Sequence, residues 1–135
     1  MTEREERAQR LHDSGYNCAQ AVVCAYCDRF GLDENTAFKM AEGFGLGMGG
    51  MENTCGALSG AIMLAGLKNS DGDLDHPKTK AGTYRISREL TEAFKEKTGA
   101  LVCRDLKGID TGKVLCSCPK CIDSAVQIVE EILGL

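Results

Sequence analysis

Apolar residues along this chain recur at intervals of three and four positions, the spacing that gathers them on one face of an α-helix. This pattern predicts a first helix that Asp13 and Ser14 can cap and that ends near Phe30, with Gly31 as its stop. A second and shorter helix follows Asp33. No long stretch alternates apolar and polar residues, so the pattern predicts no β-strand.

A glycine-rich loop separates the second helix from the third. Residues 43–50 read Gly-Phe-Gly-Leu-Gly-Met-Gly-Gly, which predicts a loop rather than a regular element. Asn53 or Thr54 can cap the third helix, which runs through Leu67 and is rich in small residues. We expect this helix to pack tightly, because small side chains let neighbouring helices approach closely.

A long amphipathic helix is predicted over residues 77–98. Its buried side carries Tyr84, Leu90 and Phe94, and charged residues occupy the opposite side. Residues 105–112 then predict a turn or a single helical turn.

The last helix is predicted to begin at Cys118, with Pro119 at the first helical position. Its expected buried residues are Ile122, Ala125, Val126, Val129 and Ile132. The whole pattern predicts an all-α fold: one domain over residues 1–135, built as a helical bundle of about five helices with a glycine-rich loop.

Composition agrees with one cytoplasmic domain. Hydrophobic residues make up 43% of the 135, which suffices for a core without disulfide staples. The net charge of −4 argues against a nucleic-acid partner, since nucleic-acid binding needs a basic face. The first seven residues show no apolar signal segment, and the near-apolar stretch 56–67 is too short to cross a bilayer. We therefore expect a cytoplasmic protein without membrane insertion.

Eight cysteines are the unusual feature of such a chain, because in the reducing cytosol metal binding or catalysis explains them better than disulfides. Four of them fall at predicted helix starts: Cys18, Cys55, Cys103 and Cys118. A helix start offers free backbone N–H donors and a partial positive charge, which stabilise a thiolate and raise its metal affinity. The alternative is that they are small buried apolar side chains.

The other four cysteines leave a second chemistry open. Cys24 and Cys27 lie inside the first predicted helix, where no N–H donors are free, and we assign them to the core. Cys118 and Cys121 have the CPxC arrangement of dithiol oxidoreductases, with Cys116 close by in the sequence. A thioredoxin fold is not predicted, because it needs β-strands.

Other motifs in the sequence lack the neighbouring residues or elements that their functions require. Residues 45–50 match GxGxxG, but no strand precedes them, so a nucleotide site is not predicted. The loop's backbone N–H groups can instead face a thiolate or cluster next to Cys55, or the loop can simply connect two helices. The only histidines, His12 and His76, are expected at the surface, which leaves no Ser-His-Asp set. Neither CxxC motif is followed by His, so covalent haem is excluded.

Four segments carry a family resemblance: Asn17-Cys18-Ala19-Gln20-Ala21, Cys55-Gly56-Ala57-Leu58-Ser59-Gly60-Ala61, Cys103-Arg104-Asp105-Leu106 and Cys118-Pro119. With them the chain resembles the C_GCAxxG_C_C family of small bacterial and archaeal redox-active proteins, from about residue 11 to residue 133. By position, the four cysteines that name the family are those at the predicted helix starts. The resemblance extends to the iron–sulfur domain of split-Soret cytochromes, where similar cysteines hold a [2Fe–2S] cluster. This chain departs by lacking the haem-binding half and by having four further cysteines: Cys24, Cys27, Cys116 and Cys121.

The resemblance implies an electron-transfer protein in which Cys18, Cys55, Cys103 and Cys118 bind an iron–sulfur cluster, [2Fe–2S] rather than [4Fe–4S]. Its partner would be another redox protein. Two alternatives stay open: a metal-free dithiol oxidoreductase that uses Cys118 and Cys121, and a structural Zn-thiolate interaction module. The sequence does not decide whether the protein is an enzyme. The small-residue helix can pack within a monomer or across a homodimer.

Overall fold

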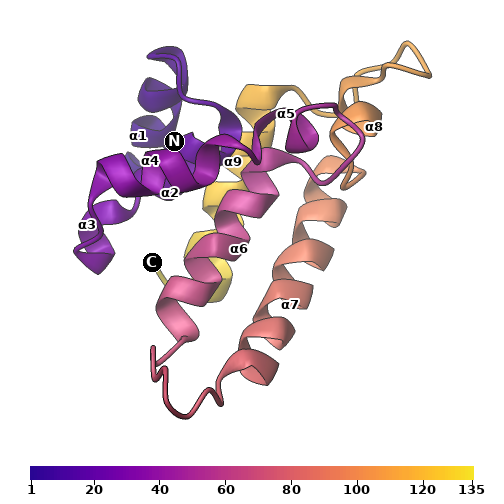
Figure 1. Cartoon of the computed structure of the whole chain (residues 1–135). Coiled ribbons are helices and arrows are strands. Elements are labelled where there is room, and N and C mark those ends of the chain that lie inside the picture. The colour runs from indigo at the N-terminus through magenta and orange to yellow at the C-terminus, as the bar shows by residue number, and fades with distance from the viewer.

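The computed structural model describes all 135 residues and is built of helices, which confirms the all-α prediction (Figure 1). Its only β-pairing is an isolated antiparallel bridge between Thr54 and Val102. The α-helical segments are α1 (Glu3–Asp13), α2 (Cys18–Cys24), α3 (Cys27–Phe30), α4 (Glu34–Glu42), α5 (Gly45–Met48), α6 (Gly56–Asn69), α7 (Lys80–Thr98), α8 (Cys103–Lys107) and α9 (Cys118–Ile128). A π-helical turn, η1 (Val129–Leu133), continues α9. None of these helices has the length and apolar content needed to cross a bilayer.

The prediction of about five helices was too low, and α1 is the largest omission. The side chain of Thr2 accepts a hydrogen bond from the Glu5 N–H at 3.2 Å, and the Glu5 carboxylate accepts one from the Thr2 N–H at 2.7 Å. This reciprocal capping box starts the helix. Only Glu5 and Ala8 are buried, so α1 has almost no apolar stripe for periodicity to detect.

The first predicted helix is divided into α2 and α3. Ser14 ends α1, and Asn17 caps α2 instead of the predicted Asp13 or Ser14. The Asn17 side chain accepts a hydrogen bond from the Gln20 N–H at 2.9 Å. Non-helical backbone at Tyr26 then separates α2 from α3, and Gly31 ends α3 in the left-handed conformation, as predicted.

The cap of α6 also differs from the prediction. Cys55 is the N-cap residue of α6, in place of Asn53 or Thr54, because Thr54 pairs with Val102 across the chain and precedes the helix in extended backbone. The predicted loop at residues 43–50 contains the short turn α5, in which left-handed residues interrupt the helix.

Helix α7 begins at Lys80 rather than at residue 77. Leu90 and Phe94 are fully buried, as predicted, whereas Tyr84 is 57% exposed and the prediction for it was wrong. Tyr84 lies in the N-terminal half of α7.

Helix α9 begins at Cys118 with Pro119 in its first turn, as predicted. Its expected core residues are buried except Ile132, which is half-buried, while its neighbour Leu133 takes the buried position. The π-helical turn adds a residue to the last turn and so shifts the buried face by one position.

Helix α6 lies at the centre, in contact with α2, α7 and α9 (Figure 1). A Cβ atom added at Gly60 would lie 3.0 Å from the Ala19 carbonyl oxygen and 3.0 Å from the Val22 Cβ. The backbones of α2 and α6 therefore touch at this glycine, which confirms the tight packing expected of the small-residue helix.

Candidate functional site

The crossing of α2 and α6 brings Cys18 and Cys55 to one end of the bundle. A Cβ atom on Gly56 would lie 3.3 Å from the Ala19 nitrogen, so the first turns of the two helices are in direct contact. Cys18 and Cys55 immediately precede Ala19 and Gly56. Close packing of α2 and α6 thus explains why glycine occupies positions 56 and 60 of the Cys-Gly-Ala-x-x-Gly segment. A side chain at either position would separate the two helices.

Backbone pairing places Cys103 beside Cys55. The Cys55 N–H donates to the Leu101 carbonyl at 2.8 Å, and the Cys103 N–H donates to the Asn53 carbonyl at 3.0 Å. From the glycine-rich loop, Gly47 approaches the same place with a φ of 57°, and a Cβ atom there would lie 2.6 Å from the Cys103 Cβ. Only glycine fits both that conformation and that space.

The loop after α8 delivers the C-terminal cysteines. The N–H groups of Leu115 and Cys116 both donate to the Leu106 carbonyl, at 3.0 Å and 3.2 Å. These bonds fold the end of the loop onto α8, and α9 then begins at Cys118 with Cys121 one turn later. Cys121 packs back on the loop, its thiol donating to the Cys116 carbonyl at 3.7 Å.

Six cysteines consequently line one cavity of about 180 Å³. They are Cys18, Cys55, Cys103, Cys116, Cys118 and Cys121. The four cysteines predicted from helix starts are all present, each in a first turn or at an N-cap. His12 also lines the cavity and is half-buried, contrary to the surface position expected of it, whereas His76 is 82% exposed.

Cys118 is the most acidic thiol of the cavity. The Lys107 ammonium donates to its sulfur at 3.3 Å, and the Cys18 thiol lies beside it. The Cys18 thiol foremost, and then Lys107, lower the pKa of Cys118 to about 5. The thiolate form of Cys118 is therefore favoured, and its proximity raises the pKa of Cys18.

Cys55 and Cys121 form a second pair of the same kind. The Cys55 sulfur lies near the Cys121 thiol and near the backbone N–H groups of Ala57 and Leu58 at the start of α6. The Cys121 thiol and these N–H groups lower the pKa of Cys55, and the proximity of Cys55 together with burial raises that of Cys121. Cys103, by contrast, has no such donor, and burial raises its pKa although it begins a helix.

This arrangement can be compared with known proteins. The sequence profile of one family, described as "Putative redox-active protein (C_GCAxxG_C_C)", matches residues 16–132. The chain belongs to this family. The comparison with curated proteins and the comparison with solved structures give no match. Family membership and the cysteine-lined cavity together support a redox role.

Lys107 is a site residue that sequence reasoning missed in this C_GCAxxG_C_C protein. It lies four positions after Cys103 on α8, so both side chains project from one face of the helix toward the cavity. Its bond to the Cys118 sulfur raises the pKa of the ammonium and keeps it charged. The i,i+4 spacing of Cys103 and Lys107 can be recognised in the sequence. The sequence does not show, however, that Lys107 contacts Cys118 on α9.

Cys24 and Cys27 lie away from the six-cysteine cavity of this family member. Both are buried in a small second core with Ala19, Ala37 and Ala41. Burial raises the pKa of Cys24 to about 12 and also raises that of Cys27. The prediction that Cys27 lies in the middle of a helix was wrong, because α3 begins at Cys27. The prediction that Cys27 is buried in the core was correct.

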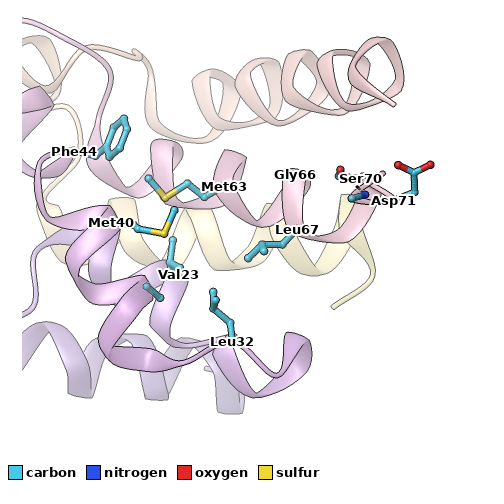
Figure 2. Close-up of a pocket in the computed structure, with 11 residues that line it drawn as sticks. Val23, Leu32, Met40, Phe44, Met63, Gly66, Leu67, Ser70 and Asp71 are labelled. Atoms are coloured by element: carbon cyan, nitrogen blue, oxygen red, sulfur yellow. Dashed lines mark hydrogen bonds between the residues drawn. The ribbon is translucent and has the colours of Figure 1, made fainter. Parts of the chain in front are cut away.

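A larger cavity of about 600 Å³ lies between α4 and α6 (Figure 2). Figure 2 shows apolar side chains around it, among them Met40, Met63 and Leu67. Its one ionisable residue, Asp71, is paired with Lys78 at 2.7 Å. No cysteine or histidine lines this cavity, in contrast to the smaller one.

Proposed function

We propose that this protein transfers electrons through an iron–sulfur cluster bound in the six-cysteine cavity by Cys18, Cys55, Cys103 and Cys118. One observation carries the proposal: four cysteines from four separate helix starts line a single cavity. Four cysteine thiolates are the usual ligand set of [2Fe–2S] and [4Fe–4S] clusters, and we favour [2Fe–2S]. A bound cluster would supply one-electron redox chemistry, which thiols alone do not.

The donor chemistry of the cavity fits such a group. Hydrogen bonds to cluster sulfurs and nearby charge set the potential of these centres. In this cavity Cys55 is the N-cap residue of α6, next to the free N–H groups of the first helical turn, and the Lys107 ammonium donates to the Cys118 sulfur at 3.3 Å. No group of three His, Cys, Asp or Glu side chains is arranged around a single metal ion. A cluster distributes its thiolate ligands over more than one iron, so it does not require that arrangement.

The role of the chain's own residues follows from this placement. The cysteines hold the centre at the ends of four helices, where the N-terminal partial charges offset the negative charge of a tetrathiolate site. Leu46 and Leu106 line the same cavity and limit the access of water to it. We expect the resulting low polarity to strengthen the influence of Lys107 on the potential.

The test is anaerobic reconstitution with ferrous iron and sulfide, followed by absorption spectroscopy and analysis of iron and acid-labile sulfide. We expect a brown protein with both elements bound. Serine variants of the four proposed ligands should lose the chromophore. Cys24→Ser is the control, because Cys24 is also a buried cysteine but lies outside the cavity, and it should keep the chromophore. A folded, colourless protein after reconstitution would refute the cluster, and bound zinc without iron would favour the structural Zn-thiolate module.

A second function, dithiol–disulfide exchange, is supported by the position of Cys18 and Cys118 in one cavity, where the Lys107 ammonium lies 3.3 Å from the Cys118 sulfur. The Cys118 thiolate would attack a substrate disulfide, form a mixed disulfide with one half and release the other half as a thiolate. Cys18 would then lose its proton and attack the Cys118 sulfur. This step would form the Cys18–Cys118 disulfide and release the second thiolate, so two electrons pass to the substrate.

Alkylation distinguishes the two functions. As a cluster ligand, Cys118 should be protected from iodoacetamide until the iron is removed with a chelator. As an attacking thiolate, it should react at neutral pH in the protein as purified. Trapping of mixed disulfides then identifies the resolving cysteine: Cys18→Ser accumulates the adduct if Cys18 resolves it, and Cys121→Ser does so if the CPxC pair operates. Rapid alkylation of metal-replete protein would replace the cluster proposal by the dithiol one.

A further inference from the structure

Exposed apolar side chains concentrate around the six-cysteine cavity. Leu46 of α5 lines the cavity and is 49% exposed, and Met48 on the same turn is equally exposed. The loop that follows α8 adds three more exposed side chains: Ile109, Val114 and Leu115. Helix α5 contacts α8, and Figure 1 shows this turn and the loop at the same end of the bundle. These five residues are half of the ten large exposed hydrophobic residues of the chain, so the clustering is local rather than general.

Charge is also distributed unevenly. Residues 43–55 and 103–121 contain four basic and three acidic residues, a balance of +1. The rest of the chain contains twelve basic and seventeen acidic residues, a balance of −5, and the two sum to the net −4. Basic side chains therefore outnumber acidic ones in these two segments, whereas acidic side chains outnumber basic ones in the rest of the protein.

Two exposed lysines carry the unpaired positive charge of these segments. Arg104 is bonded to Asp110 at 2.7 Å and to Glu52 at 3.3 Å, so these three side chains largely offset one another. Lys107 is bonded to the Cys118 sulfur, so Lys113 and Lys120 remain against a single aspartate, Asp105. Neither Lys113 nor Lys120 makes an ion pair within the chain, so both can meet charges on another molecule.

We propose that this surface, formed by the five exposed apolar residues and by Lys113 and Lys120 and called here the cavity rim, docks an acidic electron-transfer protein that reduces the bound centre. The proposal rests on the proposed function. An apolar patch with a charged surround is suited to a small, transient interface, in which burial of the patch holds the partners and charge guides their encounter. The docked partner would lie at the mouth of the cavity, next to the centre.

The reaction at this surface is a single-electron transfer. The reduced partner loses one electron and is oxidised, and the centre gains that electron and is reduced. No bond to the protein forms or breaks in the step. The rim contributes by raising the rate of productive encounters, which electrostatic steering increases by about 10- to 1000-fold at low salt.

The experiment uses the reconstituted protein and an acidic plant-type [2Fe–2S] ferredoxin, reduced beforehand, in a stopped-flow spectrometer. We expect the second-order rate constant to fall steeply as salt is added. The double variant Lys113→Glu/Lys120→Glu should react at least about tenfold more slowly at low salt. Lys68→Glu/Lys80→Glu makes the same change of charge at exposed positions at the far end of α6 and α7, and it should keep the wild-type rate.

Reduction by dithionite, a small reductant that needs no docking surface, separates the two proposals. Both double variants should be reduced by dithionite as the wild-type protein is. If no dithionite-reducible centre forms, the proposed function fails and the docking proposal fails with it. If such a centre forms but the ferredoxin does not reduce it, or reduces the rim variant and the wild type at equal rates, the docking proposal alone is overturned.

Discussion

Replacing Gly60 with alanine tests whether close contact of α2 and α6 positions the first two cysteines of the site. The new Cβ would lie 3.0 Å from the Ala19 carbonyl oxygen and 3.0 Å from the Val22 Cβ. The first of these atoms belongs to the backbone of α2 and cannot rotate away. The helices must therefore move apart by a few tenths of an ångström, and Cys18, next to Ala19, moves with α2.

The loss of stability expected for Gly60→Ala follows from a comparison with Gly66, a second glycine of α6. Gly66→Ala changes the same helix, but a Cβ at Gly66 meets no atom within 4 Å. Both substitutions gain helix propensity, about 0.5–1 kcal/mol, because alanine restricts the unfolded chain more than glycine does. That gain cancels in the comparison of the two variants. What remains is the overpacking at Gly60, about 1–3 kcal/mol.

Thermal and urea unfolding of the two variants measure this difference. For a chain of this length each kcal/mol corresponds to about 3–5 °C in Tm, so Gly60→Ala should melt about 3–15 °C below Gly66→Ala. Gly66→Ala itself should match or exceed the wild type. We also expect Gly60→Ala to change the alkylation rate of Cys118, since Cys18 lines the same cavity and contributes to the low pKa of Cys118. If Gly60→Ala is as stable as Gly66→Ala, the α2–α6 contact does not have the role assigned to it.

Two further predictions concern charge. Lys107→Gln removes a charged hydrogen bond to the Cys118 sulfur, worth about 1.5 kcal/mol at a half-exposed site, and so should raise the pKa of Cys118 by about one unit. The alkylation rate of metal-free protein measured from pH 4 to 8 should shift accordingly, with Lys107→Arg as the charge-preserving control, and an unchanged profile would contradict the role of Lys107. The second prediction concerns Asp28, whose pKa two hydrogen bonds from Arg4 lower to about 2. A folded pKa below the unfolded one stabilises the fold above about pH 4, and the stabilisation is lost as the pH falls toward 2. Asp28→Asn should therefore be less stable than wild type at pH 6, by about 0.5–1 kcal/mol for this exposed pair, and equal to it near pH 2 in urea unfolding; the same deficit at both values would count against the ion pair.

The sequence predicted the ends of helices correctly where the capping or terminating residue lies within one turn of the helix end. Asp33 caps α4, Gly31 ends α3, and α9 starts at Cys118 with Pro119 in its first turn. The predictions failed where a distant residue competes for the same backbone. Thr54 pairs with Val102, and this long-range contact moves the start of α6 to Cys55.

The sequence by itself determined the all-helical class and the helix-start positions of Cys18, Cys55, Cys103 and Cys118, because capping and periodicity depend on residues within a few positions of one another. Only the tertiary structure decided that Cys116 and Cys121 join these four and that Lys107 faces Cys118. It also decided which thiols lie near one another. Cys18, from the other end of the chain, lies beside Cys118, and Cys121 lies beside Cys55. Such pairings arise from the crossing of α2 with α6 and from the contact of residues 51–55 with residues 101–104, and no local pattern encodes them.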